Sequence, residues 1–169
     1  MSVQQQQYPK VLAVASAGGH WVQLMRLRSA WQGCSVAYLT TEPSYAAEVF
    51  SEDEEGRAKS VRFYTTLSAN RWQKLRLLRQ LFDVVWVLFK ERPDVVCTTG
   101  AAPGYFAIRL GKFFGARTVW IDSIANAETM SLAGIKAASC ADVWLTQWEA
   151  LTMSQNHSGR SPEYWGAVL

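Results

Sequence analysis

The segment SAGGH, residues 16–20, has the residue types of an anion-binding turn and ends on a histidine. It follows the apolar run 11–15 and opens a segment with helical periodicity, so it is expected at the carboxyl end of a strand. Glycines let backbone amides approach an anion closely, and a helix start offers free amides and a positive dipole end. A phosphate or diphosphate is therefore the expected ligand, with Ser16, Gly18 and Gly19 as candidate binding residues.

A second turn of this kind, TTGAAPG at residues 98–104, follows another apolar run. The hydroxyls of Thr98 and Thr99 and the amide of Gly100 are its candidate phosphate donors. Glycine-rich turns also arise between strands and helices for steric reasons alone, so either turn has a purely structural explanation. Two such turns after adjacent strands favour a binding site. Neither contains G-x-G-x-x-G or G-x-x-x-x-G-K-[ST], which weakens dinucleotide and P-loop interpretations.

Three polar side chains near these turns could take part in a reaction. A histidine titrates near neutral pH, so His20 is a candidate general base or partner of an anionic oxygen; alternatively it caps backbone groups at a helix start. Asp122, at the end of the apolar run 117–122, is a candidate base or hydroxyl-binding residue, or alternatively a brace for its loop. Asn126 belongs to the same loop and is a candidate binding residue.

Short β-rich runs alternate with helix-length segments along the chain. This alternation predicts one α/β domain with a mostly parallel sheet covered on both faces by helices. We assign residues 11–169 to that domain and residues 1–10 to a flexible leader, and we expect the acidic stretch 52–56 to be a solvated loop. The expected strands are 11–15, 34–40, 61–66, 94–99, 117–122 and 142–147. The expected helices lie near 20–31, 43–51, 70–91, 103–114 and 128–140.

Composition argues against several classes of protein. A formal net charge of +3, from 17 basic and 14 acidic side chains, is too small for a general nucleic-acid binder. Cys34, Cys97 and Cys140 lie far apart among apolar residues, so we expect free thiols in a reducing cytosol rather than metal ligands. No segment approaches the ~20 apolar residues that span a bilayer, so any membrane contact is expected to be peripheral.

The segment 71–91 is more apolar than packing on one sheet requires. On a helical wheel its apolar side chains fill an arc of roughly 200°, about twice the width that a sheet-packed helix uses. Basic residues gather near its start. We predict that the surplus meets an anionic membrane or another protein; the alternative is a deeply buried core helix. The residues expected to face a membrane are Arg76, Arg79, Phe82, Trp86 and Phe89.

Four motifs together resemble one protein family. SAGGHWVQLMRL, PDVVCTTGAAPG, ADVWLTQW and YWGAVL stand in the order and spacing found in the acceptor-binding subunit of split GT-B glycosyltransferases. That family includes the membrane-tethered subunit of the eukaryotic enzyme that adds the second GlcNAc to a dolichol-linked sugar, and shorter bacterial exopolysaccharide proteins. The resemblance covers residues 11–169 and implies a fold equivalent to the N-terminal half of a GT-B enzyme.

The resemblance implies one subunit of an inverting glycosyltransferase. This chain would bind a polyprenyl-diphosphate-linked sugar, with both glycine turns and Asn126 facing that acceptor and His20 or Asp122 acting on its hydroxyl. A separate donor-binding subunit would bind the UDP-sugar, without a cofactor, and activity would require both chains. The resemblance also implies a peripheral protein on the cytoplasmic, inner face of the plasma membrane.

The sequence departs from the family in the loop from Asp122 to Asn126. Members often read Glu-Ser-x-Ala-Arg there, so the acid is shortened and the cation is absent. We find no N-terminal membrane anchor in the sequence, which indicates the bacterial branch; a glucosyl lipid acceptor and UDP-glucuronic acid are then the expected substrates. Two other functions stay open: a non-catalytic scaffold that recruits the catalytic subunit to the membrane, and a self-sufficient nucleotide-binding enzyme.

Overall fold

The protein is built around a parallel sheet. The computed structural model describes residues 8–53, 58–70, 72–153 and 159–168. The strand order is β3-β2-β1-β4-β5-β6-β7, and all pairings between these strands are parallel. The strands are β1 (Lys10–Val14), β2 (Ser35–Thr40), β3 (Ser60–Thr65), β4 (Val95–Thr98), β5 (Arg117–Ile121), β6 (Val143–Thr146) and β7 (Glu163–Tyr164).

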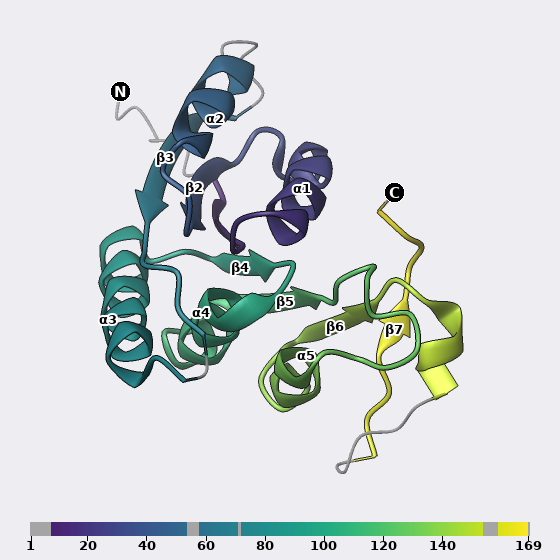
Figure 1. Ribbon diagram of the computed structural model, residues 1–169. Coiled ribbons are helices and arrows are strands. Elements are labelled where there is room, and N and C mark those ends of the chain that lie inside the picture. Colours follow the sequence, from purple (N-terminus) through teal and green to yellow (C-terminus); the bar gives the residue numbers. More distant parts are fainter. Residues whose placement is uncertain (1–7, 54–57, 71, 154–158, 169) are drawn as a thin grey trace.

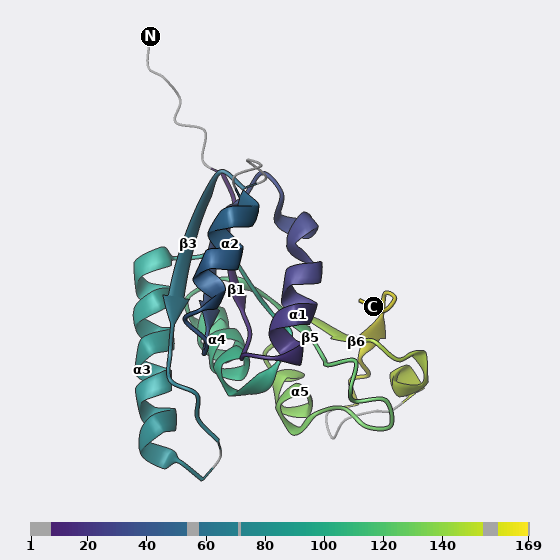
Figure 2. The same cartoon turned by 45° about the horizontal axis from the view of Figure 1, so that its top comes forward.

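Helices lie on both faces of this sheet (Figure 1 and Figure 2). On one face, Trp21, Leu24 and Val49 of the first two helices pack against the sheet. On the other face, the next three helices bury residues such as Leu88 and Ile108. Successive strand residues point to opposite faces, so the nearly continuous apolar strands supply both cores. The helical elements are α1 (Gly19–Arg26), η1 (Arg28–Trp31), α2 (Tyr45–Asp53), α3 (Lys74–Glu91), α4 (Ala101–Phe113), α5 (Leu132–Ala137) and η2 (Glu149–Met153).

The predicted fold class is confirmed, and the differences lie in element boundaries. Each of the six expected strands is present. β7 is a seventh strand that the sequence did not predict, because its two exposed residues are too few to form a recognisable pattern. The helix expected at 20–31 ends at Arg26 and is followed by the short 3-10 turn η1. The helix expected at 128–140 is reduced to the six residues of α5, which Ser131 caps by accepting the amide of Gly134.

Two other predicted segments include residues that the structure does not describe. Lys10 belongs to β1 and pairs with Ser35, so the expected leader overlaps the sheet by one residue; residues 1–7 lie outside the described part. α2 continues to Asp53 and therefore runs into the stretch expected to be a loop. Residues 54–57 of that stretch lie outside the described part as well.

The α1 face of the sheet is covered unevenly. Over β4, β5 and β6, this face borders an apolar cavity of about 510 Å³, which is also lined by η1 and the C-terminal residues 165–168. Val95, Cys97, Val119, Ile121 and Leu145 point into this cavity from the three strands, and Trp31 and Trp165 contribute aromatic walls. The expectation that helices cover both faces is thus only partly met on this side.

The helix α4 approaches β4 unusually closely because it carries glycine at two positions one heptad apart. A Cβ atom at Gly104 would lie 2.1 Å from the Thr98 hydroxyl, and one at Gly111 would lie 2.7 Å from the Val96 side chain. Because both positions lack a side chain, α4 can pack closely against β4 immediately after the second glycine turn. The position of that turn is therefore set by the packing of α4 as well as by the conformation of its own residues.

We expect Gly104→Ala to lower the free energy of unfolding by at least about 2 kcal/mol, because the added methyl overpacks a buried contact. Chemical denaturation of the purified chain measures this change. Gly19→Ala is the control, because a Cβ there meets no atom within 4 Å and the backbone is not left-handed. A stability loss of equal size in both variants would contradict the packing argument.

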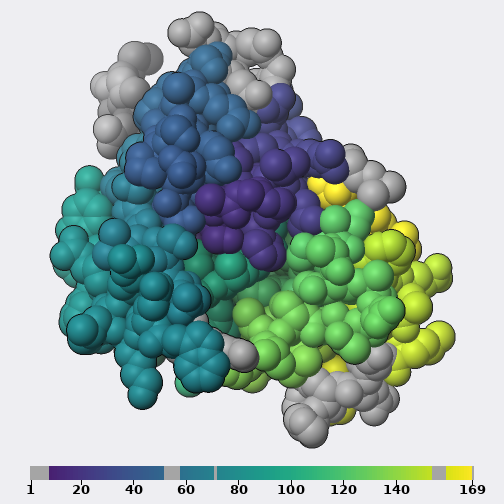
Figure 3. Space-filling view, viewed as in Figure 1, coloured from purple at the N-terminus to yellow at the C-terminus, as the bar shows by residue number. Residues whose placement is uncertain are grey.

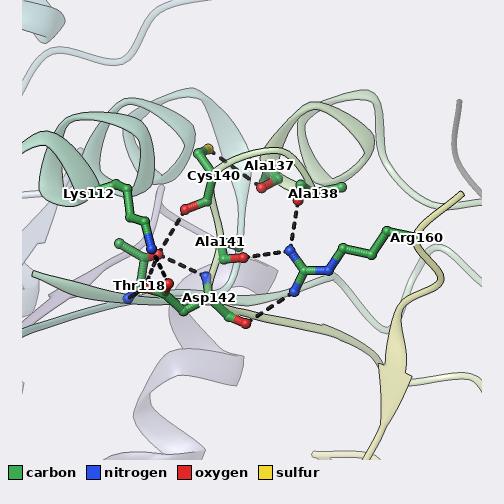
Figure 4. A network of polar contacts seen from close by, with 8 residues as sticks. All are labelled: Lys112, Thr118, Ala137, Ala138, Cys140, Ala141, Asp142 and Arg160. Carbon is green, nitrogen blue, oxygen red and sulfur yellow. Dashed lines mark hydrogen bonds and ion pairs between the residues drawn. The ribbon is translucent and has the colours of Figure 1, made fainter. Parts of the chain in front are cut away.

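A polar network fastens the C-terminal segment to the second half of the sheet (Figure 4). The Arg160 guanidinium donates to three carbonyl oxygens that follow α5, and it lies 5.8 Å from the ring of Trp144. Beside it, Asp142 accepts hydrogen bonds from Lys112 of α4 and from the amide and hydroxyl of Thr118 on β5. These bonds join α4, β5, β6 and the segment that leads to β7.

The charge of Asp142 should make this network sensitive to acid. Burial raises the pKa of Asp142, but hydrogen bonds from Lys112 and Thr118 lower it more, so the pKa lies below its ordinary 3.8. A carboxyl with a depressed pKa stabilises the folded state above its unfolded pKa, and this contribution is lost as the pH falls through the folded pKa. We expect Asp142→Asn to cost about 1 kcal/mol of unfolding free energy at pH 7 and progressively less below about pH 4. Urea denaturation of both proteins across that range tests this; a constant difference would contradict it.

Candidate functional site

Two helix starts lie side by side at the carboxyl edge of the central strands. The His20 Nδ1 atom lies 2.8 Å from the carbonyl oxygen of Thr99, and the Thr99 hydroxyl donates to the carbonyl of His20 at 2.6 Å. A carbonyl oxygen only accepts, so we assign the proton of the neutral imidazole to Nδ1. In this tautomer the Nε2 atom carries the lone pair that can accept a proton. The His20 side chain is half-buried. We call this reciprocal pair of bonds the His20–Thr99 clasp.

The second turn is shaped to receive the imidazole. Gly100 has φ 128, a conformation that favours glycine, and a Cβ atom there would lie 2.8 Å from the His20 Cε1 atom. The next residue, Ala101, has φ 65, which is uncommon for a residue with a side chain and marks strain at the start of α4. The two glycine turns predicted from the sequence are thus brought into direct contact.

Several groups expected to bind a phosphate are already used inside the protein. The Gly18 amide donates to the Tyr45 hydroxyl at 3.2 Å. Thr98 is fully buried; its hydroxyl donates to a β1 carbonyl and accepts the amide of Gly100. The Thr99 hydroxyl belongs to the clasp. These four residues therefore shape the turns, and their predicted role as direct donors to a phosphate does not fit their geometry.

Other donors remain at the two helix starts. Within the described residues, no acceptor is found for the amides of Gly19, His20, Ala101 and Ala102, as is usual for the first turn of a helix. Ser16 lies partly exposed at the end of the first turn. Two positive helix ends with free amides, held together by the clasp, form a place where an anion can bind.

A third loop takes part that sequence reasoning missed. The Thr41 hydroxyl, just after β2, accepts the amide of Ala17, and Tyr45 stacks on Trp21 of α1 with ring centroids 4.9 Å apart. Both contacts fix the first glycine turn from the side. The available signal was the pair Thr40 and Thr41 at the end of the predicted strand 34–40, which resembles the pair Thr98 and Thr99 at the end of the predicted strand 94–99.

Asp122 is held as a brace rather than as a free base. It is only 2% exposed. Its Oδ1 accepts from the Trp120 indole at 3.1 Å and the Ser131 hydroxyl at 2.6 Å, and its Oδ2 accepts from the Asn126 amide at 3.0 Å and the Ser131 backbone at 2.9 Å. All four donors belong to the protein itself, so both carboxylate oxygens are engaged in internal hydrogen bonds rather than directed toward a substrate. The geometry thus corresponds to the loop-bracing alternative, and Asn126 serves the same brace.

The surface is hollowed between the start of α3, in teal, and the green residues that follow β5, with the purple first turn at the margin (Figure 3). The site therefore opens toward a space flanked by α3 on one side and the Asp122 loop on the other. Among the described residues, no group of three His, Cys, Asp or Glu side chains could hold a metal ion.

α3 carries an apolar stripe on the side directed away from the core. Its members follow the spacing i, i+3, i+7, i+11, i+14 and are 49 to 83% exposed. Val84, Val87 and Leu88 on the opposite side are buried, so the helix is not the deeply buried core helix of the alternative interpretation. The outer stripe consists of Leu75, Leu78, Phe82, Trp86 and Phe89.

Cations border the outer stripe. Arg76 and Arg79 are exposed, and Arg79 pairs with Asp83 at 3.0 Å. Near the other end of the helix, the Lys90 ammonium lies 4.8 Å from the ring centroid of Trp86. α3 forms one side of the molecule in both ribbon views (Figure 1 and Figure 2). No described helix has the length and apolarity needed to cross a membrane.

Comparison with known proteins shows similarity to one protein in sequence and to several solved structures in fold. No family model matches the chain. The mouse protein named UDP-N-acetylglucosamine transferase subunit ALG14 is 27% identical, over 84% of this chain and 76% of its own length. The crystal structure of MurG from Acinetobacter baumannii has a TM-score of 0.61 at 18% identity, over 82% of this chain and 41% of MurG.

A UDP-N-acetylglucosamine 2-epimerase from Rickettsia bellii has a TM-score of 0.60 at 18% identity, over 85% of this chain and 40% of the epimerase. The chain thus spans about two fifths of the solved structures it matches. The fold is a single α/β domain equivalent to the N-terminal, Rossmann-like half of a GT-B protein. In sequence the chain is similar to a glycosyltransferase subunit.

Proposed function

We propose that this protein is the acceptor-binding subunit of an inverting glycosyltransferase and binds a polyprenyl-diphosphate-linked sugar. The carrying observation is the clasp, which holds two helix starts and the His20 imidazole together at one edge of the sheet. The free amides of Gly19 and Ala101 would face the diphosphate. ALG14, a transferase subunit by name, supports the assignment to this class.

In this proposal His20 is the general base. The acceptor hydroxyl would donate its proton to Nε2 while its oxygen attacks the anomeric carbon of the donor sugar, and the bond from that carbon to the UDP oxygen would break. The Nδ1–H bond to the Thr99 carbonyl orients the ring and supports the positive charge that develops on it. A second chain would supply the donor-binding half, because one Rossmann-like half forms only one wall of the cleft.

The proposal includes a membrane surface as the place of action. The outer stripe of α3 offers large apolar side chains for insertion between lipid headgroups, and neighbouring cations favour an anionic leaflet. A lipid-linked acceptor would then be reached from the inner face of the plasma membrane. We extend the proposal to exopolysaccharide repeat-unit synthesis with UDP-glucuronic acid as donor, because the family that the four motifs resemble includes bacterial exopolysaccharide proteins.

The test is reconstitution with the native neighbouring proteins. We expect no sugar transfer by the purified chain alone, and transfer from a UDP-sugar to a prenyl-diphosphate-linked sugar once a co-purified donor-binding protein is added. Mass spectrometry identifies that protein. Robust turnover by the chain without any second protein would contradict the proposal and favour a self-sufficient enzyme.

A scaffold without a chemical role is the second candidate. It is favoured because hydrogen bonds within the protein already occupy the Asp122 carboxylate and the hydroxyls of Thr98 and Thr99. It predicts that a complex with an altered His20 still turns over normally. Activity of the reconstituted pair with a His20 variant decides between the two functions.

A further inference from the structure

Gln147 is the one described side chain that hydrogen-bonds to α1, to the Asp122 loop and to the C-terminal segment. It follows β6 and is 3% exposed. Its Nε2 donates to the Asp122 carbonyl at 2.8 Å and to the Gln23 Oε1 of α1 at 3.3 Å, and its Oε1 accepts the amide of Val168 at 2.8 Å. A carboxamide can donate and accept at once, so it connects segments that no apolar residue could join in this way.

Each of the first two segments carries part of the candidate site. Gln23 lies one turn after His20 in α1, and Asp122 braces the loop to Ser131. The Gln147 bond reaches the backbone of Asp122 itself, while the carboxylate of the same residue holds the loop. A shift of the Gln147 carboxamide would therefore move the brace and the helix that begins with the clasp.

The third segment is weakly held, which makes it able to move. Residues 163–167 are exposed, and β7 contributes only two residues to the sheet. Beyond Trp165, two hydrogen bonds hold the described residues: the Val168 amide donates to Gln147, and the Val168 carbonyl accepts from Arg26 at 3.4 Å. Residues 165–168 also form one wall of the apolar cavity over β4, β5 and β6. Few buried contacts and an exposed backbone are the properties of a locally opening segment.

We infer that Gln147 is a positioning residue that couples the C-terminal segment to α1 and to the Asp122 loop: release of Val168 loosens the Asp122 loop and shifts the helix that begins with the clasp, and so weakens diphosphate binding. This rests on the proposed function for the ligand, whereas the mechanical coupling does not. Because the coupling passes through one carboxamide, it can be removed without substituting any residue of the clasp, of the two helix starts or of the outer stripe.

The test is a double-mutant cycle in the full chain. Val168→Pro removes the amide that Gln147 accepts, and Gln147→Met removes the carboxamide at similar volume. Ala167→Pro is the matched control, because no described residue accepts the amide of Ala167. We expect each of the two variants to weaken binding of farnesyl diphosphate by about tenfold, and the double variant to show no further loss.

Hydrogen exchange without ligand supplies the independent readout. We expect faster amide exchange in residues 123–131 in Val168→Pro and in Gln147→Met, unchanged exchange in the central strands, and wild-type behaviour in Ala167→Pro. Additive effects of the two variants, or a Val168→Pro protein whose 123–131 loop exchanges as in wild type, would overturn the inference. If wild type binds no farnesyl diphosphate while the exchange result holds, the proposed function fails and the coupling stands.

Discussion

We expect His20→Ala to lower the turnover of the reconstituted transferase by about 10²-fold or more, because the proposed reaction loses the group that would take the acceptor proton. The same variant should bind its partner subunit normally. Steady-state kinetics of the complex and a melting curve of the purified chain measure the two effects.

His20→Asn is the matched control for this experiment. Its side-chain amide can still donate to the Thr99 carbonyl and so preserve half of the clasp, but it offers no basic nitrogen at the position of Nε2. We expect it to be as inactive as His20→Ala and more stable. Recovery of turnover in His20→Asn would assign His20 a purely structural role.

The second large effect is expected at the outer stripe of α3. Replacing Phe82, Trp86 and Phe89 together by serine should lower partitioning onto anionic vesicles at least 100-fold, since each inserted aromatic side chain contributes about 1.5–3 kcal/mol. Vesicle flotation measures the partitioning. The stripe faces away from the core, so the fold should be retained.

Two further variants separate lipid insertion from general stickiness. Phe113→Ser removes an aromatic ring that is 87% exposed on α4 and outside the stripe, and it should leave flotation unchanged. Arg76→Glu with Arg79→Glu should weaken binding at low salt only, because each basic residue contributes about 1 kcal/mol through a screened interaction. If wild type does not float with anionic vesicles, alone or with its partner, the stripe is a protein interface.

The features predicted well from the sequence are those that local pattern determines. Apolar runs identified the six longer strands, and the two glycine turns were placed correctly at the edge where parallel strands end. The helical wheel of residues 71–91 correctly indicated more apolar side chains than the sheet can bury. Only one side of α3 packs on the core, so the remaining apolar side chains are exposed. In each case the pattern that supports the prediction lies within a few consecutive residues.

The use of each polar group was not predictable in this way. Whether the Gly18 amide is free depends on Tyr45, 27 residues later, and Gln147 meets Gln23 across 124 residues. Whether the Asp122 carboxylate is fully hydrogen-bonded depends on the loop that brings Ser131 back beside it. Partners of this kind are set by tertiary packing, so residue types identified the candidates but could not separate braces from reactive groups.

The strand order also imposes a sequence of events during synthesis. Val14 of β1 pairs with Thr98 of β4, and 84 residues separate them, although β1 is an interior strand of the sheet. A ribosome needs roughly 4–17 s to make that stretch at about 5–20 residues per second. In that interval β1, β2 and β3 can assemble with α1 and α2 while the other edge of β1 stays open and apolar. The nascent chain therefore passes through a stage in which one edge of β1 is unpaired, and aggregation competes with folding at that stage.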